Sequence, residues 1–565
     1  MTTAEAQKLS SSGSSGVLKA ATVMGAATFI SRILGLVREQ VFAVLFGAGN
    51  ATDAFNVAFR IPNLLRDLFA EGAMSASLVP TFTRTLAEDG ERRAWRVAGL
   101  VFRVLFVSVS ILALIGIFFA PQLVGIYASA FKDVPGKFEL TVRMTQIMFP
   151  FFPLVALAAA VMGILNARGR FFIPALSSAL FNVGSIVVGT ASALLLFKYG
   201  ARFGIQPIEG MALGVLVGGL VQVLSQFPSL YRSGYRWPVK EPSDPAWHRD
   251  PRLRAMLWMM VPGTIGLAAT QINILVNTVL ATSQGPGAVS WLNYAFRLMQ
   301  FPIGVFGVSL AAATLPRVSH LFVSGDIAGV RNTLNSSLRQ VIAVNIPASA
   351  GLAFLGFPII ELLFQYGRFY PQDTQATAIA LAMYAVGLTA YSAVKVLVPA
   401  CYALGNTRIP VISSIVAVFA TIGLNLLMIR PFGYWGLALG TSLAAILNSA
   451  FLLRAIRMIL RQHGSDLEYA PLLRTLSGQV LVALVMGSAC WVTHLGFRHY
   501  VPDVLFVEIF GVSALPIIRS IKVFALVIEG IFLTLVLARI FRLRDTTDAY
   551  DFFAIKIKKK LQSRS

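Results

Sequence analysis

"SRILGLVREQ", residues 31–40, places three charged side chains inside a stretch that is otherwise apolar enough to cross a bilayer. The apolar stretch covers residues 17–49. A membrane-spanning helix needs about 20 mainly apolar residues. Ionisable groups inside such a helix are costly and usually functional. Arg32, Arg38 and Glu39 are therefore the first candidates for a functional site.

The composition of the whole chain is that of a membrane protein. Of its 565 residues, 56% are hydrophobic and 13% charged, and the mean hydropathy is +0.73. Soluble domains carry about 25% charged residues. Apolar runs of helical length recur along the chain, without the alternation that is typical of a membrane barrel. We predict an all-α polytopic membrane protein.

The net charge of +22 has a simple explanation in such a protein. Basic residues collect in cytoplasmic loops of membrane proteins, so no nucleic-acid partner is expected. Cys401 and Cys490 both lie in apolar runs, and the five histidines show no ligand spacing. We therefore expect no disulfide, no metal site and no cofactor. No phosphate-binding loop signature is present, and the chain is not predicted to be an enzyme.

The apolar runs give fourteen predicted spans. They cover residues 18–48, 53–85, 95–128, 138–166, 172–199, 208–232, 252–282, 287–322, 330–364, 374–404, 409–430, 435–461, 471–497 and 516–541. Odd-numbered loops such as "GAGNAT" (47–52) carry little positive charge, whereas even-numbered loops carry most of it, for example at Arg168 and Arg170. This asymmetry places both termini in the cytoplasm, as an even number of spans requires.

The chain also repeats itself. "NVAFRIP" (56–62) resembles "NYAFRLM" (293–299), and "RFFIPALSS" (170–178) resembles "NTRIPVISS" (406–414). These matches predict two six-span repeats related by an axis along the membrane normal, a plan found in secondary transporters. The predicted parts are a flexible cytoplasmic tail (1–17), an N-lobe (18–233), a cytoplasmic linker (234–251), a C-lobe (252–463), two extra helices (464–541) and a basic cytoplasmic tail (542–565).

Three predicted spans have one polar face each when drawn at 100° per residue. The faces are Thr28, Ser31, Arg32, Gly35, Arg38 and Glu39 on the first span; Asp53, Asn56, Arg60, Asn63, Asp67 and Glu71 on the second, with Arg66 beside them; and Asn293, Arg297, Gln300, Gly304 and Gly307 on the eighth. Such faces must point at a water-filled cavity or at each other, because an arginine facing lipid would cost at least ~2.5–3.5 kcal/mol.

Arginine is informative because its planar, permanently charged group fits phosphate oxygens in pairs. Arginines converging in one cavity predict an anionic substrate, a phosphate or a diphosphate, and argue against a cationic drug. The alternative, that these charges form structural ion pairs between helices, stays open. Arg32 and Glu39 are seven residues apart on one helix, as are Arg60 and Asp67, so their partners would come from other helices.

Residues 31–80 resemble the N-terminal signature of the MurJ (MviN) family of bacterial lipid II flippases, and residues 290–319 resemble its eighth helix. The similarity covers residues 18–500. It implies a transporter of the MOP superfamily, with two six-helix lobes around a central cavity and two extra helices that form a groove for a polyprenyl tail. The implied activity is movement of undecaprenyl-diphosphate-linked disaccharide-pentapeptide, lipid II, to the outer leaflet of the cytoplasmic (inner) membrane for peptidoglycan synthesis, by alternating access.

The resemblance also implies site residues. The family's functional positions fall on Ser31, Arg32, Arg38, Asp53, Arg66 and Arg297; the polar faces add Glu39, Arg60 and Asn293 as substrate-binding candidates. Phe296 stands where many members have an aspartate before the eighth-helix arginine, and Glu39 stands where many have an aspartate. The family's sodium ligands do not map securely here, so coupling to the membrane potential or to a monovalent cation is left open.

Two other functions remain to be separated from this one. A flippase or exporter for another polyprenyl-diphosphate-linked glycan would share the arginines, but general polysaccharide flippases lack the block at residues 31–80. A non-transporting scaffold for other cell-wall synthesis proteins would gain nothing from arginines inside its spans. Lipid II and the lipid bilayer are the expected partners, with cell-wall synthesis proteins as a further candidate.

Overall fold

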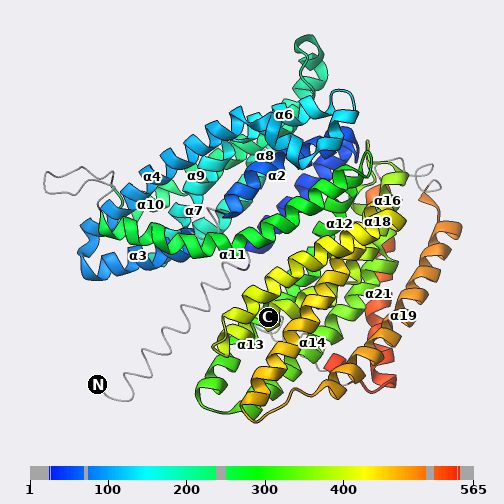
Figure 1. The fold of residues 1–565 in the computed structure, drawn as a ribbon. Helices are drawn as coiled ribbons and strands as arrows, with labels where there is room; N and C mark the ends of the chain where they lie inside the picture. The colour runs from blue at the N-terminus through cyan, green and yellow to red at the C-terminus, as the bar shows by residue number, and fades with distance from the viewer. Residues whose placement is uncertain are drawn as a thin grey trace, which may run out of the picture. The chain divides into compact units, whose positions relative to one another are not determined.

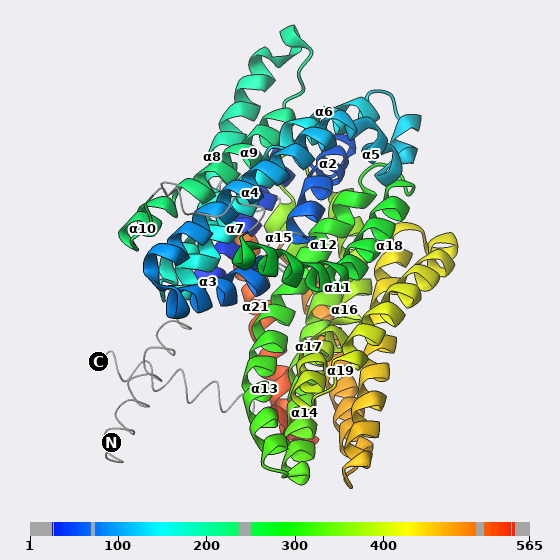
Figure 2. The same cartoon turned by 60° about the vertical axis from the view of Figure 1, so that its left-hand side comes forward.

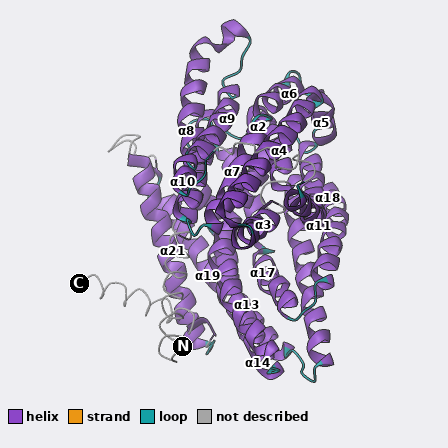
Figure 3. Cartoon of the chain, turned by 90° about the vertical axis from the view of Figure 1, so that its left-hand side faces the viewer, coloured by secondary structure: helices purple, strands orange, loops and turns teal. Residues whose placement is uncertain are grey.

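The computed structural model describes residues 25, 27–68, 74–236, 250–503, 514–543 and 545–547, and within them the side chains outside residues 75–76 and 261–270. Every regular element in these ranges is helical, and no strand is present among them (Figure 3). The all-α prediction is therefore confirmed. The chain divides into two compact units, Met1–Pro286 and Gly287–Ser565.

The first unit is built from consecutive helices joined by short turns (Figure 1). Its described helices are residues 27–46, α2 (Asn50–Arg66), α3 (Met74–Glu88), α4 (Gly90–Phe118), α5 (Ala120–Tyr127), η2 (Ser129–Asp133), α6 (Lys137–Met148), α7 (Phe151–Ala167), α8 (Phe172–Tyr199), η3 (Gly200–Phe203), α9 (Glu209–Leu224), α10 (Phe227–Arg232) and α11 (Pro251–Thr282). Gly90 and Gly136 start α4 and α6 with φ of +83° and +75°, a backbone conformation that glycine adopts most readily.

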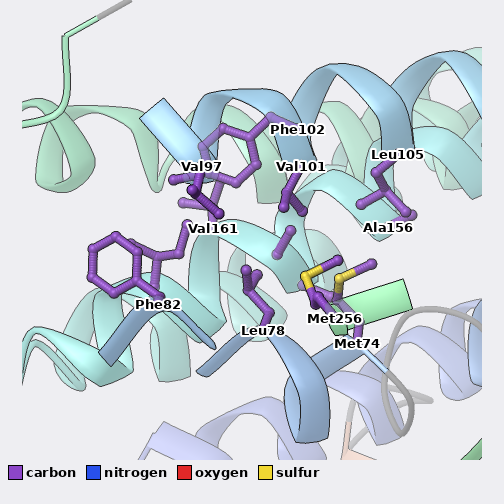
Figure 4. Packing of buried hydrophobic residues seen from close by; sticks show 14 of the residues in the cluster. Met74, Leu78, Phe82, Val97, Val101, Phe102, Leu105, Ala156, Val161 and Met256 are labelled. Carbon is purple, nitrogen blue, oxygen red and sulfur yellow. The ribbon is translucent and has the colours of Figure 1, made fainter. Parts of the chain in front are cut away.

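One hydrophobic core cluster of the first unit lies between α3, α4 and α7 (Figure 4). Leu78 and Phe82 of α3 pack there against Val101 of α4 and Val161 of α7, and all four side chains are almost fully buried. The opposite face of α4 carries exposed apolar side chains, including Leu114, which is 65% exposed. A helix that is apolar on both its packed and its exposed face is suited to a lipid environment rather than to water.

The second unit is likewise a series of consecutive helices (Figure 2). Its described elements are α12 (Ala288–Pro302), the π-helical η5 (Ile303–Gly307), α13 (Val308–Val323), α14 (Ile327–Phe354), α15 (Gly356–Phe364), α16 (Pro371–Ala385), α17 (Leu388–Ala403), α18 (Arg408–Gln462), α19 (Tyr469–Tyr500) and α21 (Leu515–Ile540). Helices α13, α14 and α17 pack on one another around Val318, Leu338 and Leu397. Gly433 interrupts α18 with φ +60° and ψ −141°, so α18 is two helices joined at a kink.

Several described helices can cross a membrane. Eight are long and apolar enough, or up to ten if each bent pair is one span. The bent pairs are α14 with α15, at 67°, and α16 with α17, at 43°, where the sequence predicted the single spans 330–364 and 374–404. The predicted span 95–128 is also broken, between α4 and α5. Pro121 and Pro358 lie just inside α5 and α15, where proline fits the first turn of a helix but cannot continue the preceding one.

Helix α11 belongs to the first unit, although the predicted C-lobe begins at residue 252. Asp250 is fully buried and accepts hydrogen bonds from the backbone N–H groups of Arg252 and Leu253, at 3.0 and 3.3 Å. Its other oxygen pairs with Arg93 at 2.8 Å, and Arg252 pairs with Glu88 at 2.6 Å. These contacts hold the start of α11 against the α3–α4 turn. The predicted lobe boundaries stay a prediction, and the predicted tails and linker lie largely outside the described residues.

Candidate functional site

Arg32 lines a cavity of about 270 Å³ inside the first unit. Its guanidinium is exposed and has no hydrogen-bond or ion-pair partner among the described residues. Ser31 lines the same cavity, and its backbone oxygen accepts a hydrogen bond from Asn182 Nδ2 of α8 at 3.1 Å. This bond fixes the helix of residues 27–46 against α8. An unpaired arginine at an open cavity can bind an anion.

Arg38 lies in a different environment, one and a half turns further along the same helix. It is 7% exposed and pairs with the neighbouring Glu39 at 3.2 Å. Its guanidinium carbon lies 5.8 Å from the centre of the Phe59 ring and 5.7 Å from that of Phe181, within the range of cation–π attraction. In this conformation Arg38 is therefore packed between aromatic rings and does not line the cavity at Arg32.

Asp53 is part of a buried ion pair between two helices. Its carboxylate lies 3.2 Å from Lys137 Nζ at the start of α6, and the two side chains are 0% and 3% exposed. The Lys137 ammonium also lies 3.9 Å from the centre of the Phe131 ring. Asp53 on α2 and Lys137 on α6 therefore form an ion pair between two helices, as the structural alternative to substrate binding predicts.

The end of α2 carries a smaller polar network. Arg66 pairs with the neighbouring Asp67 at 2.8 Å, and both side chains are 24% exposed. Asp67 also accepts hydrogen bonds from Asn63 and, across to α11, from Gln271, each at 3.4 Å. Arg60, one and a half turns earlier, is half-buried. The candidate Glu71 lies outside the described residues.

The remaining candidates, Asn293 and Arg297, belong to α12 of the second unit. Both are half-buried, and both have interaction partners. Phe296, the chain neighbour of Arg297, packs against Tyr384 with ring centres 5.4 Å apart. That Arg32, Arg38 and Arg297 share one cavity stays a prediction.

The extra helix α19 carries a shallow, wide-open groove along one of its own faces. Its lining is mainly leucine and valine: Leu473, Leu476, Val480, Leu481 and Leu484, with Arg474 and Ser477 at one end. Arg474 lies near the start of α19, so the polar end of the groove is the end nearer residue 469. An apolar groove with one basic end matches the chemistry of a lipid chain attached to an anionic head.

Three residues that contact the candidates were not found from the sequence. Lys137 lies 84 positions from Asp53, and Phe181 lies far from Arg38, so no local pattern connects either pair. Asn166 of α7 lines the cavity beside Arg32, and its Oδ1 is buried without a hydrogen-bond partner among the described residues. In the sequence, only the position of this asparagine within an apolar span could have marked it as a candidate, because a buried side-chain amide normally has a hydrogen-bond partner.

The fold defines the class of protein. It is similar to the inward-facing structure of a multidrug resistance MATE family transporter of the MOP superfamily, with a TM-score of 0.66 and 15% identity over 79% of this chain and 99% of that one. A solved structure described as lipid II flippase MurJ in an inward closed conformation matches with a TM-score of 0.73 and 25% identity, over 92% of this chain and 98% of that one. The fold is that of a polytopic membrane transporter.

The sequence comparisons identify the family. The family model of lipid II flippase MurJ matches residues 42–511. A relative from Vibrio cholerae, named probable lipid II flippase MurJ, is 35% identical over 450 residues, which are 78% of this chain and 83% of the relative. The chain belongs to the MurJ family of lipid II flippases and is a multi-pass membrane protein, a transporter rather than an enzyme.

Proposed function

We propose that this chain moves lipid II from the inner to the outer leaflet of the bacterial cytoplasmic membrane by alternating access. The observation that carries this proposal is the 35% identity with a named lipid II flippase along most of both chains. The site chemistry agrees with it. Arg32 offers an unpaired guanidinium to the cavity of the first unit, and a diphosphate is an anion that such a fork binds through paired hydrogen bonds.

The proposed architecture is fourteen spans in two six-helix repeats with two extra helices. Helices that begin at equivalent places in the two halves support the repeat. Helix α14 begins at Ile327, 237 residues after α4 at Gly90; α17 begins at Leu388, 237 residues after α7 at Phe151; and α18 begins at Arg408, 236 residues after α8. The same offsets relate the sequence matches. The kink at Gly433 supports counting α18 as two spans, since 55 helical residues would extend about 80 Å.

Both termini are proposed to lie in the cytoplasm. Reporter fusions in the loops at Gly49 and Gly285 should then report the outer side. Fusions in the α3–α4 turn next to Arg93 and in the predicted linker at Lys240 should report the inner side, because these two loops and their flanks carry the basic residues. A reversed report from any of these four loops would contradict both the topology and the repeat. As a control, the four fusion proteins are compared at equal expression of the full-length product.

The groove on α19 is proposed to hold the polyprenyl tail of the substrate, with its basic end toward the head group. We leave the driving force as two candidates, the membrane potential and a monovalent cation. Flipping by proteoliposomes under an imposed potential, with and without a sodium gradient, separates them. Interaction with other cell-wall synthesis proteins is proposed only as a consequence of a shared substrate.

Rescue of bacteria depleted of their own lipid II flippase tests the proposal. Expression of this chain should restore lipid II at the outer leaflet and growth. If the chain instead exports a different polyprenyl-diphosphate glycan, growth fails while that glycan reaches the outer leaflet. If it is a scaffold, purified protein binds no polyprenyl diphosphate.

A further inference from the structure

We propose that the cavity beside Arg32 is a binding site for the sugar that is joined to the diphosphate of the substrate. This inference rests on the proposed function and adds to it a place for one chemical group. The cavity lies between the helix of residues 27–46, α7 and α8, all within the first unit. Its lining residues are Thr28, Ser31, Arg32, Met162, Asn166, Phe171, Pro174, Ala175 and Ser178.

The charge of the cavity selects an anion. The guanidinium of Arg32 has no acidic partner among the described residues, so its charge is available to a ligand. The cavity also meets the start of α8 at Phe171 and Pro174. This 28-residue helix has no side-chain cap, and uncapped N–H groups at a helix start favour negative charge. A phosphate group fits at this end of the cavity.

A phosphate alone does not supply a hydrogen-bond donor to the buried polar atom of the cavity, Asn166 Oδ1. Asn166 Oδ1 is buried and is an acceptor without a donor in the described part of the chain. A phosphate diester brings acceptors only, whereas a hydroxyl or an amide N–H of the ligand would donate to Asn166. The hydroxyls of Ser31 and Ser178, which line the cavity as well, can both donate and accept. The ligand therefore carries an anion and hydrogen-bond donors on neighbouring atoms.

The size and the apolar lining point to a sugar. A volume of about 270 Å³ has room for a group the size of one monosaccharide. The half-buried ring of Phe171 supplies an apolar wall against which the C–H face of a sugar can lie. A sugar phosphate would therefore pair with the charge of Arg32, donate a hydrogen bond to Asn166 Oδ1 and fit the volume of the cavity.

The first test separates the sugar from the diphosphate. The affinity of purified full-length protein is measured for undecaprenyl diphosphate and for the same lipid carrying its first sugar. Asn166→Ala should weaken binding of the sugar-bearing lipid about 3- to 10-fold, the effect of one lost hydrogen bond, and leave the sugarless lipid unchanged. Arg32→Gln should weaken binding of both lipids.

Asn448→Ala is the matched control. Asn448 of α18 is also an asparagine whose buried Oδ1 has no hydrogen-bond partner among the described residues, but it belongs to the second unit and does not line the cavity. Both affinities should be unchanged in this variant. Equal weakening of the two lipids by Asn166→Ala would overturn the sugar site. Absence of binding to either lipid by the unaltered protein would instead contradict the proposed function itself.

A second test does not depend on affinities. Ser178 is exposed at the cavity, while the native Cys401 and Cys490 are buried, so Ser178→Cys gives a single accessible thiol within the described residues. The sugar-bearing lipid should protect this thiol from a maleimide more strongly than undecaprenyl diphosphate does. Equal protection by vesicles of phosphatidylglycerol would overturn the proposal, because the cavity would then take ordinary lipid head groups.

Discussion

Lys137→Met should lower the free energy of unfolding by about 3–5 kcal/mol, since it removes the ammonium that pairs with the buried carboxylate of Asp53. The pair is almost completely removed from water, so neither charge can be solvated in the folded unit. Chemical unfolding of the purified protein in detergent measures the effect. Lys132→Met is the control, because Lys132 is exposed on η2 and its loss should change stability by no more than about 0.5 kcal/mol.

The double variant Asp53→Asn with Lys137→Met decides what Asp53 does. If Asp53 is structural, removing both charges should restore most of the stability, and flipping should recover with it. A double variant that is stable but binds no diphosphate lipid would show that one of the two charges is needed for binding in addition to stability. Equal stability of Lys137→Met and the unaltered protein would mean that the pair does not form in the membrane.

Arg38 is buried against Glu39 in this conformation, so it can bind a diphosphate only in another state of the transport cycle. If it does so, Arg38→Lys should weaken binding of undecaprenyl diphosphate about 10- to 100-fold, nearly as much as Arg38→Ala. Lysine keeps the charge, but it loses the planar fork that pairs with phosphate oxygens and the flat face that lies against Phe59 and Phe181. Arg297→Lys should have a similar effect if the same diphosphate reaches it. The measurements are lipid binding and rescue of flippase-depleted cells, at equal membrane levels of each variant.

Arg84→Lys serves as the control for these two variants. The Arg84 side chain is 70% exposed and pairs with Glu88, four residues further along α3, at 2.7 Å. Lysine should replace it without loss. Full binding by both Arg38→Lys and Arg297→Lys would show that the arginines act as positive charge alone, and the paired contact with phosphate would be withdrawn.

The sequence alone predicted the class of the protein and the course of many helices. Apolar runs of helical length can be read locally, and glycine and proline mark where they stop. The predicted span 172–199 coincides with α8, and the predicted span 252–282 differs from α11 by one residue. The family signature likewise lies in contiguous residues, so it required no knowledge of contacts between helices.

The tertiary structure decided what surrounds each charged residue. The helical period places Arg32 and Arg38 on one face of the first span and treats them alike. The structure places Arg32 at an open cavity and Arg38 between two rings, and it gives Asp53 a partner from another helix. A helical period fixes the side of a helix on which a residue lies. The neighbour on that side comes from a distant part of the chain, and only packing brings the two together.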